Sequence, residues 1–244
     1  MPALEVVIHC WKYARLLTYQ LSSLYLHPLR DGELSVTVWH APTEDPDTVR
    51  VLKFFSSLRP VPGLTWSWRC LPHEYLVNRA IGRNLSALET QAEWIWFADA
   101  DYVVREGFLD TMLALLRVQT TPLIYPEVVQ ATTHEDGARL IEDMSRIFAE
   151  CGPQVVEVTE DGLIEQRFSK AIGGVQFAKG EACRSLGYCN KPREQQPYGG
   201  NWRPDVEDRK FRLSLGTPGA PVLVPGLVRI RHGERGGPAK VVEF

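Results

Sequence analysis

The sequence has no long apolar run. A membrane-spanning helix needs about 18 or more consecutive apolar residues, and no such stretch occurs in this chain. The N-terminal residues Met1–Glu5 do not form a basic region followed by an apolar core, which a secretion signal requires. We therefore expect neither membrane insertion nor secretion, and we expect the protein to be cytoplasmic.

Closely spaced cysteines and a surplus of basic residues are also missing. The five cysteines are scattered, so they suit reduced thiols in a cytoplasm better than a zinc site or a disulfide framework. Their positions are Cys10, Cys70, Cys151, Cys183 and Cys189. The net charge of −3 gives no basic character, so composition does not indicate a nucleic-acid partner. Repeats are absent too, and 244 residues are enough for a globular protein with its own core.

The most informative stretch is a short apolar run that ends in two carboxylates. Trp94–Ala98 is apolar and rich in aromatic residues, which predicts a strand buried on both faces of a parallel sheet. In an extended chain, Asp99 and Asp101 point the same way from the C-terminal end of that strand. Open α/β sheets bind ligands at this edge. Two carboxylates there suit Mg²⁺ or Mn²⁺, and the alternative interpretation is a turn without a ligand.

Strands and helices alternate around this run through the first 120 residues. The predicted strands are Leu4–Cys10, Leu34–Trp39 and Thr65–Leu71, and the predicted helices are Tyr13–Leu26, Thr48–Leu58, Val77–Glu89 and Glu106–Arg117. This alternation predicts a doubly wound, mostly parallel sheet, with the loop His9–Lys12 at the same edge as the carboxylates. A second Asp-x-Asp, Asp45-Pro46-Asp47, precedes a helix, so we assign Asp47 to an N-cap rather than to a metal.

The second half has shorter apolar runs and more turn residues. A strand at Leu123–Tyr125 and a helix at Gly137–Glu150 precede a predicted hairpin of Val155–Thr159 and Leu163–Phe168 around an Asp-Gly turn. Gly173 and Gly174 stand before a strand, where backbone can approach a ligand closely. The polar loop Asn190–Trp202 is long enough for a lid. A helix at Val206–Leu215 and strands at Val222–Val224 and Leu227–Ile230 complete the pattern.

Five features follow one another along nearly the whole chain. They are the opening strand with its loop, Arg79–Asn84 upstream of Trp96–Asp101, Gly173-Gly174-Val175 before a strand, Glu207-Asp208 opening a helix, and the late His232. In this order they resemble the GT-A fold glycosyltransferases, most closely the inverting family-2-like enzymes. The resemblance implies a single α/β domain of GT-A type with a Rossmann-like, doubly wound, mostly parallel sheet. Residues 1–120 then bind the nucleotide sugar, and a smaller mixed α+β half, 121–244, binds the acceptor and carries the base.

The resemblance assigns a donor and metal site. Asp99 and Asp101 correspond to the acids that hold the nucleotide ribose and the metal bridging the donor diphosphate. His232 corresponds to the late metal ligand, so the expected cofactor is Mn²⁺ or Mg²⁺, with imidazole favouring Mn²⁺. The donor-binding candidates are His9, Trp11, Arg83, Asn84, Asp99, Gly173 and Gly174. Arg83 is a candidate for a phosphate contact or for an ordinary solvated arginine, and the loops Asn190–Trp202 and Arg231–Lys240 are candidates for lids.

The resemblance also assigns a catalytic base. Asp208, next to Glu207 at the start of a helix, corresponds to the acid that takes the proton of the acceptor hydroxyl. Asp205 competes with it, because Arg203-Pro204-Asp205-Val206 stands where a tryptophan-glycine pair often precedes the Glu-Asp. An acid at a helix start is also a routine cap.

The implied function is metal-dependent, inverting transfer of a hexose from a nucleotide sugar to a hydroxyl of a glycan or other acceptor, as in polysaccharide biosynthesis. A UDP-sugar is the expected donor, although Trp39–Asp45 holds no clean counterpart of the acid that reads uracil. Two alternatives stay open. A nucleotidyltransferase acting on sugar phosphates would share the sheet, but no early glycine-rich phosphate loop is present. A domain that only binds nucleotide or glycan would keep the same acids.

Overall fold

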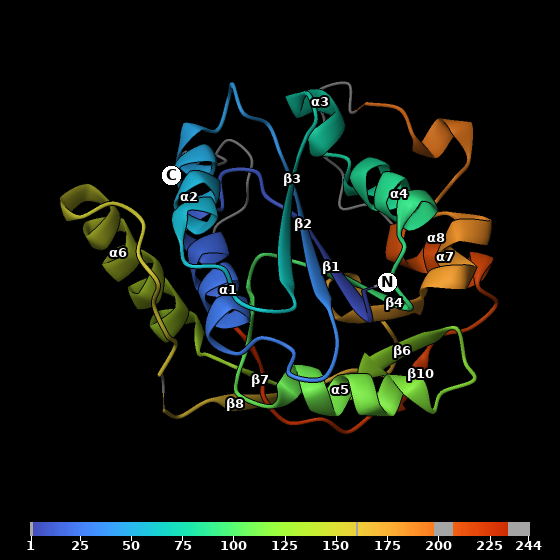
Figure 1. Ribbon diagram of the computed structural model, residues 1–244. Coiled ribbons are helices and arrows are strands. Elements are labelled where there is room, and N and C mark those ends of the chain that lie inside the picture. The colour runs from blue at the N-terminus through green and yellow to red at the C-terminus, as the bar shows by residue number, and fades with distance from the viewer. Residues whose placement is uncertain (1, 160, 198–206, 234–244) are drawn as a thin grey trace, which may run out of the picture.

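The computed structural model describes residues 2–159, 161–197 and 207–233. Within these ranges the main feature is a seven-stranded sheet in the order β10-β6-β9-β4-β1-β2-β3 (Figure 1). Its strands are β1 (Leu4–His9), β2 (Leu34–His40), β3 (Leu64–Cys70), β4 (Trp94–Ala98), β6 (Leu123–Pro126), β9 (Gln176–Lys179) and β10 (Ala220–Val222). Neighbouring strands are parallel except where β9 runs antiparallel to β4 and β6. The predicted α/β fold with a mostly parallel sheet is confirmed.

Helices cover both faces of this sheet. They are α1 (Ala14–Leu26), α2 (Pro46–Ser57), α3 (His73–Leu76), α4 (Arg79–Glu89), α5 (Phe108–Arg117), α6 (His134–Glu150), α7 (Gly180–Leu186) and α8 (Glu207–Ser214), with short 3₁₀ turns η1 (Gly173–Val175) and η2 (Pro192–Glu194). Figure 1 shows α1 and α2 on one side of the sheet and α4, α7 and α8 on the other. This cover buries every residue of β4, as the apolar run predicts.

A smaller sheet fixes the chain that follows the two carboxylates. Among the described residues its order is β5-β11-β7-β8, formed by β5 (Tyr102–Val104), β11 (Leu227–Arg229), β7 (Val128–Ala131) and β8 (Ile164–Arg167). β11 runs antiparallel to β5, which sets Arg229 opposite Tyr102. The N–H of Ile230 donates to the carbonyl of Asp101 at 2.8 Å. The end of the described chain is therefore held beside the Asp-x-Asp.

The predicted hairpin at 155–168 is wrong. The residues Ile164–Arg167 form β8, but they pair with β7 and not with 155–159, where the described residues contain no strand. The N–H of Val156 instead donates to the Ser22 hydroxyl of α1 at 3.1 Å. Val156 is thus held at α1 and not at β8, and β8 pairs with β7 instead.

One helix cap and one whole helix differ from the sequence predictions. The helix α2 begins at Pro46, and its N-cap is Asp45, whose side chain accepts from the N–H of Thr48, rather than Asp47. The proline at the first helical position explains the shift, since it needs no hydrogen-bond partner there. The helix α7 was not predicted, and it follows β9 directly.

No described helix has the length and apolar character needed to cross a membrane. One hydrophobic core includes residues of both predicted halves, from Ala3 to Ile230. The two loops predicted as lids extend into 198–206 and 234–244, which lie outside the described residues. Their closure over a donor stays a prediction.

Candidate active site

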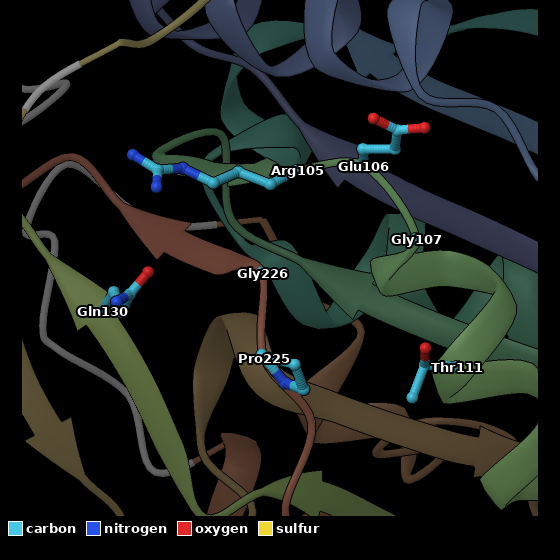
Figure 2. A pocket seen from close by; sticks show the side chains of 7 residues that line it. All are labelled: Arg105, Glu106, Gly107, Thr111, Gln130, Pro225 and Gly226. Atoms are coloured by element: carbon cyan, nitrogen blue, oxygen red, sulfur yellow. The ribbon is translucent and has the colours of Figure 1, made fainter.

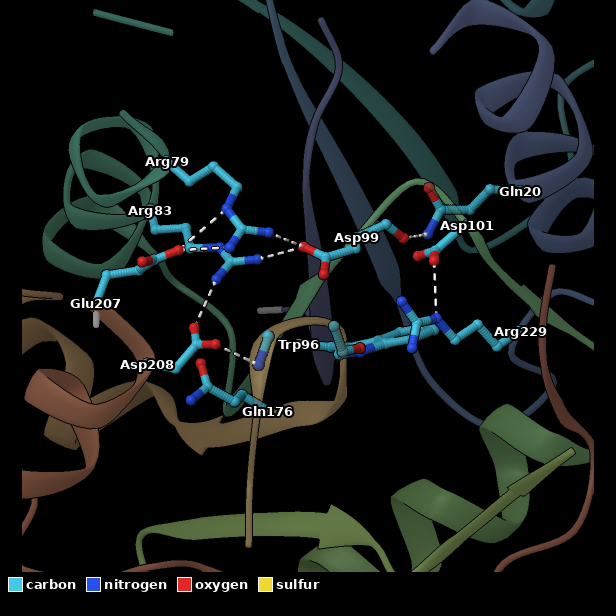
Figure 3. A network of polar contacts seen from close by, with 12 residues as sticks. Gln20, Arg79, Arg83, Trp96, Asp99, Asp101, Gln176, Glu207, Asp208 and Arg229 are labelled. Carbon is cyan, nitrogen blue, oxygen red and sulfur yellow. Dashed lines mark hydrogen bonds and ion pairs between the residues drawn. The ribbon is translucent and has the colours of Figure 1, made fainter. Parts of the chain in front are cut away.

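The two carboxylates after β4 lie in a turn, not in an extended strand. The strand ends at Ala98, and the carbonyl of Asp99 accepts from the N–H of Tyr102 at 3.4 Å and from the Gln20 amide at 2.9 Å. The expectation that Asp99 and Asp101 share a face is therefore wrong, because it assumed extended backbone. Figure 3 shows the Asp99 side chain directed toward arginines of α4 and the Asp101 carboxylate beside Arg229.

Two arginines of α4 hold Asp99. Arg79 Nη1 and Arg83 Nη2 each donate to Asp99 Oδ1 at 2.8 Å. Their spacing of four residues places both on the same helix face. The side chain of Arg83 is fully buried, so it is neither the solvated arginine nor the phosphate contact that the sequence suggested.

The same arginines also bind the two acids at the start of α8. Arg79 donates to Glu207 Oε1 through Nε at 3.1 Å and through Nη2 at 2.5 Å. Arg83 Nη1 donates to Asp208 Oδ1 at 3.2 Å. The structure thus joins the strand end at Asp99 to the helix start at Glu207 through two parallel arginine links (Figure 3).

Asp208 has two further donors. The Tyr188 hydroxyl lies 2.9 Å from Asp208 Oδ1, and the N–H of Gly173 donates to Asp208 Oδ2 at 2.7 Å. Tyr188 was not a sequence candidate, because it stands in a segment without periodic pattern or motif. The side chain of Asp208 is still 22% exposed, so this carboxylate can reach a ligand.

The paired glycines lie in close contact with protein side chains, while the predicted close approach of their backbone to a ligand stays a prediction. A Cβ on Gly173 would lie 3.0 Å from Asp99 Oδ2, and one on Gly174 would lie 2.3 Å from the Tyr102 ring. The carbonyl of Gly174 also accepts from the Trp96 indole at 2.8 Å. These contacts place η1 against the site, between the end of β4 and the start of α8.

Burial and ion pairing shift the pKa values of the charged groups in opposite directions. Burial alone would raise the pKa of Asp99, but Arg79 and Arg83 outweigh it and hold this pKa below its ordinary value. Burial alone would lower the pKa of Arg83, whereas Tyr188, Asp99 and Asp208 raise it above the ordinary range. Both groups are therefore charged in the folded protein.

Asp101 belongs to a second cluster, with Arg229 and His232. Arg229 Nε donates to Asp101 Oδ2 at 2.9 Å, and His232 Nε2 lies 3.8 Å from the same oxygen. Asp101 Oδ1 and His232 Nδ1 are buried without a hydrogen-bond partner among the described residues. Burial and the negative charge of Asp99 raise the pKa of Asp101, while Arg229 opposes the shift.

The predicted metal ligands do not form one cluster. Among the described residues no three His, Cys, Asp or Glu side chains are close enough to hold a metal ion, and Asp99 Oδ1 is engaged by two guanidiniums. Asp101 and His232 do lie together, each with an unpartnered atom. Mg²⁺ and Mn²⁺ commonly take one or two protein ligands together with water and substrate phosphate. The residues present therefore fit a metal on Asp101 and His232, without Asp99.

The described candidates His9 and Trp11 have contacts of their own with other parts of the protein. His9 is buried against Gly82, and burial with the nearby Arg83 and Arg79 lowers its pKa well below the ordinary value. The Trp11 ring packs against the His73 ring at a tilt of 33°, with centroids 3.9 Å apart. The candidate base Asp205 lies outside the described residues.

Asn84 connects α4 to the segment that holds Tyr188 and Asn190. Its Oδ1 accepts from the N–H of Tyr188 at 2.8 Å, and its Nδ2 donates to Asn190 Oδ1 at 3.1 Å. The side chain is buried. These bonds show Asn84 holding the Tyr188 segment against α4, a role different from the donor contact predicted for it.

A separate cavity of about 330 Å³ lies beside β5 and β11 (Figure 2). It is lined by Arg105, Glu106, Gly107, Thr111, Gln130, Pro225 and Gly226. None of these residues belongs to the network of Figure 3. Across it, the N–H of Arg105 donates to the carbonyl of Gly226 at 2.7 Å. The acids and arginines, rather than this cavity, are the candidate site.

Comparison with known proteins supports the fold. No protein-family model matches the sequence, and no curated protein matches it. Among solved structures, residues 1–349 of S. aureus TarS in complex with UDP-GlcNAc align with 96% of this chain and 59% of that one, at a TM-score of 0.61 and 11% identity. The mannosyltransferase PcManGT from Pyrobaculum calidifontis, in complex with GDP-Man and Mn²⁺, aligns with 94% of this chain and 57% of that one, at a TM-score of 0.51 and 17% identity. The chain thus spans just over half the length of these two chains, and it shares their GT-A type of fold.

Proposed function

We propose that this protein is a hexosyltransferase that moves a sugar from a nucleotide-sugar donor to a hydroxyl of a glycan or other acceptor. One observation carries the proposal: Asp99, at the end of β4, and Asp208, at the start of α8, meet at one sheet edge through Arg83. Ligands of open α/β sheets bind at that edge. The two structural neighbours support it, since they hold UDP-GlcNAc and GDP-Man.

Asp208 is the proposed general base. In a single displacement the acceptor oxygen attacks the anomeric carbon, its proton passes to the Asp208 carboxylate, and the bond to the diphosphate breaks with inversion. The partial exposure of Asp208 and its charged partner Arg83 suit this role. Glu207 suits it less, because its side chain is 5% exposed and Arg79 engages its Oε1. Asp205 stays a second candidate.

The charge of the site supports dependence on a divalent cation. When all are ionised, the four carboxylates exceed the three guanidiniums by one charge. The carboxylates are Asp99, Asp101, Glu207 and Asp208, and the guanidiniums are Arg79, Arg83 and Arg229. An incoming diphosphate would thus meet no surplus of positive charge. Mn²⁺ or Mg²⁺ held by Asp101 and His232 would neutralise the charge of the leaving diphosphate.

The proposed nucleotide is a uridine diphosphate, with Trp11 as an aromatic surface beside it at the end of β1. The position of Asp45, an acid between β2 and α2, does not support a role in binding uracil. Asp45 caps α2 and also accepts from the N–H of Lys12 at 2.6 Å, so its carboxylate is already engaged. Donors with uracil and with guanine must therefore be compared directly.

The test is a panel of UDP- and GDP-sugars with Mn²⁺ and simple sugar acceptors, read by release of nucleoside diphosphate. We expect release with at least one donor, loss of release in chelator, and a product of inverted anomeric configuration. A nucleotidyltransferase would instead consume a nucleoside triphosphate with a sugar phosphate and release pyrophosphate. Binding of UDP without release from any donor would indicate a non-catalytic domain.

A further inference from the structure

Arg83 and Tyr188 form the buried part of the acid–arginine network. Both side chains are fully buried, and Arg83 Nη1 donates to the Tyr188 hydroxyl at 3.0 Å. The same hydroxyl lies 2.9 Å from Asp208 Oδ1 and 3.1 Å from the amide oxygen of Gln176. Asp208 therefore has a guanidinium and a phenol on one oxygen, from two side chains that are fully buried.

The burial of Arg83 calls for an explanation other than stability. Removing a guanidinium from water is costly, and a buried ion pair often adds little to stability compared with an apolar replacement. Arg83 Nε is also buried without a hydrogen-bond partner among the described residues. What this arginine does achieve is geometric, because its two Nη atoms reach Asp99 and Asp208 at once.

The hydroxyl of Tyr188 is also held in a fixed position beside Asp208. Its ring stacks on Phe211 at 4.3 Å and contacts Phe97 at 4.7 Å between centroids, so the aromatic core fixes where its hydroxyl lies. The hydroxyl accepts from Arg83 and has one proton to donate. The ionised carboxylate of Asp208 is a stronger acceptor for it than the neutral amide of Gln176.

We propose that Arg83 and Tyr188 are positioning residues: they fix the Asp208 carboxylate at the acceptor hydroxyl and tie it to Asp99 on the donor side, without contacting either substrate. This assignment rests on the proposed function, since it gives Asp208 the role of base. It predicts that the two residues act on turnover through Asp208. Substrate binding then depends on Tyr188 only weakly.

The test is Tyr188→Phe, which keeps the ring and its packing and removes only the hydroxyl. We expect kcat to fall about tenfold or more, the usual effect of losing a hydrogen bond to a charged group. The KM values for donor and acceptor should stay within about twofold, because no binding contact is lost. Tyr19→Phe is the matched control, since its buried hydroxyl donates to the Leu140 carbonyl at 3.0 Å, away from the site. It should lose comparable stability and keep its turnover.

Arg83→Lys separates geometry from charge. Lysine keeps the positive charge in the network, but its single ammonium cannot present two nitrogens to two carboxylates. We expect a folded variant with reduced kcat and weaker donor binding, since Asp99 keeps Arg79 but loses the second of its two guanidinium partners. Wild-type turnover in Arg83→Lys would mean that only charge is needed and would overturn the assignment.

The outcomes are distinguishable from failure of the proposed function. If Asp208→Asn abolishes transfer while Tyr188→Phe turns over at the wild-type rate, the function holds and the positioning role is wrong. If Tyr188→Phe raises KM and leaves kcat unchanged, the residue shapes a binding site and the assignment is again wrong. If the wild-type protein transfers no sugar from any donor of the panel, the function fails and this assignment falls with it.

Discussion

Asp208, Asp99 and Asp101 differ in how the protein engages their carboxylates. Asp208 accepts from three groups on both oxygens, Asp99 from two guanidiniums on one oxygen, and Asp101 from Arg229 while its Oδ1 has no described partner. A carboxylate with an unpartnered buried oxygen is the natural place for a cation. A fully oriented but partly exposed carboxylate is the natural base.

Asp208→Asn should abolish most of the turnover. The amide keeps the shape of the carboxylate but cannot take a proton, and a general base contributes typically 10²- to 10⁴-fold. We expect a loss of that size in kcat with donor affinity nearly unchanged, together with some loss of stability, because the amide nitrogen must face a group that donates to Asp208 in the wild-type protein. The measurement is steady-state kinetics with calorimetry of UDP binding.

Asp205→Asn is the comparison for that experiment. If Asp205→Asn loses turnover without losing donor affinity while Asp208→Asn does not, the base lies three residues earlier in the sequence. If neither change affects turnover, the single-displacement mechanism itself is wrong.

Asp101→Asn should weaken nucleotide binding rather than turnover at saturation. Its carboxylate is paired with Arg229 and lies 3.8 Å from His232, where we place the divalent cation. Calorimetry should show tight UDP binding only when Mn²⁺ or Mg²⁺ is present, and a loss of that metal-dependent part in Asp101→Asn. Equal affinity in excess chelator would contradict the metal proposal.

At the residue scale, the sequence located the acids better than their partners. Asp99, Asp208 and Gly173 could be proposed because each follows a local signal: a buried strand, a helix start or a glycine pair. The burial of Arg83 could not be predicted, because its partners Asp99 and Asp208 are 16 and 125 residues away along the chain. The sequence shows only an arginine on the polar side of a helix.

Among the elements, α2 offers the clearest case where structure corrects a local signal. Asp45-Pro46-Asp47 holds two candidates for the N-cap, and the structure selects Asp45. Its carboxylate accepts from the N–H of Thr48 at 3.2 Å, the Thr48 hydroxyl at 2.8 Å and the N–H of Lys12 at 2.6 Å. Lys12 has φ +59°, a backbone conformation that this contact helps to hold. One side chain thus fixes both the helix start and the loop after β1.

Asp45→Ala should therefore destabilise the protein by about 1 to 2 kcal/mol, the upper part of the range for lost N-caps. Asp47→Ala is the matched control, because Asp47 is 38% exposed and pairs with Arg15 and Arg50. Exposed ion pairs contribute about 0 to 1 kcal/mol. Urea denaturation of both variants gives the comparison. A loss in Asp47→Ala that equals or exceeds that in Asp45→Ala would restore the sequence assignment of the cap.

Long elements were easier to predict than short ones: β5, β7 and α7 were not predicted, and β8 was predicted as a strand with the wrong partner. The strand β4 and the helices α1, α4 and α5 have runs long enough for their period to be recognised. The strands β5, β7 and β8 are three or four residues long and gain their hydrogen bonds from partners distant in sequence. The hairpin error at 155–168 has this cause, because an Asp-Gly turn indicates a hairpin only when both flanking runs lack better partners.

For the whole molecule, the GT-A type of fold places a buried histidine inside a charged site. His9 ends β1, and both its ring nitrogens are buried without a hydrogen-bond partner among the described residues. Burial, Arg83 and Arg79 lower its pKa, and only Asp99 opposes them. His40, at the end of β2, has a pKa lowered by burial as well. The carboxyl edge of the main sheet therefore keeps two histidines neutral, and this links global stability to pH.

The sign of that link follows from proton uptake. In the unfolded chain His9 titrates near its ordinary value of 6.5, while in the folded protein it resists protonation. Below pH 6.5 the unfolded state therefore binds more protons, and the free energy of unfolding decreases as the pH falls. This contribution is fully present above pH 6.5 and is lost progressively below it. Asp99, whose pKa is lowered, adds a similar loss only below its unfolded value of 3.8.

His9→Gln should reduce the change in the free energy of unfolding between pH 6.5 and pH 5. A proton taken up only by the unfolded state lowers the free energy of unfolding by at most about 1.4 kcal/mol per pH unit, so we expect the wild-type protein to lose stability through His9 as the pH falls from 6.5 to 5. His40→Gln should remove a further part of the pH dependence, because burial lowers the pKa of His40 as well. Urea denaturation at half-unit steps of pH measures the slopes. A His9→Gln variant with the slope of the wild-type protein would mean that His9 takes up its proton in the folded state, which would require the neighbouring arginines to move away from the site on acidification.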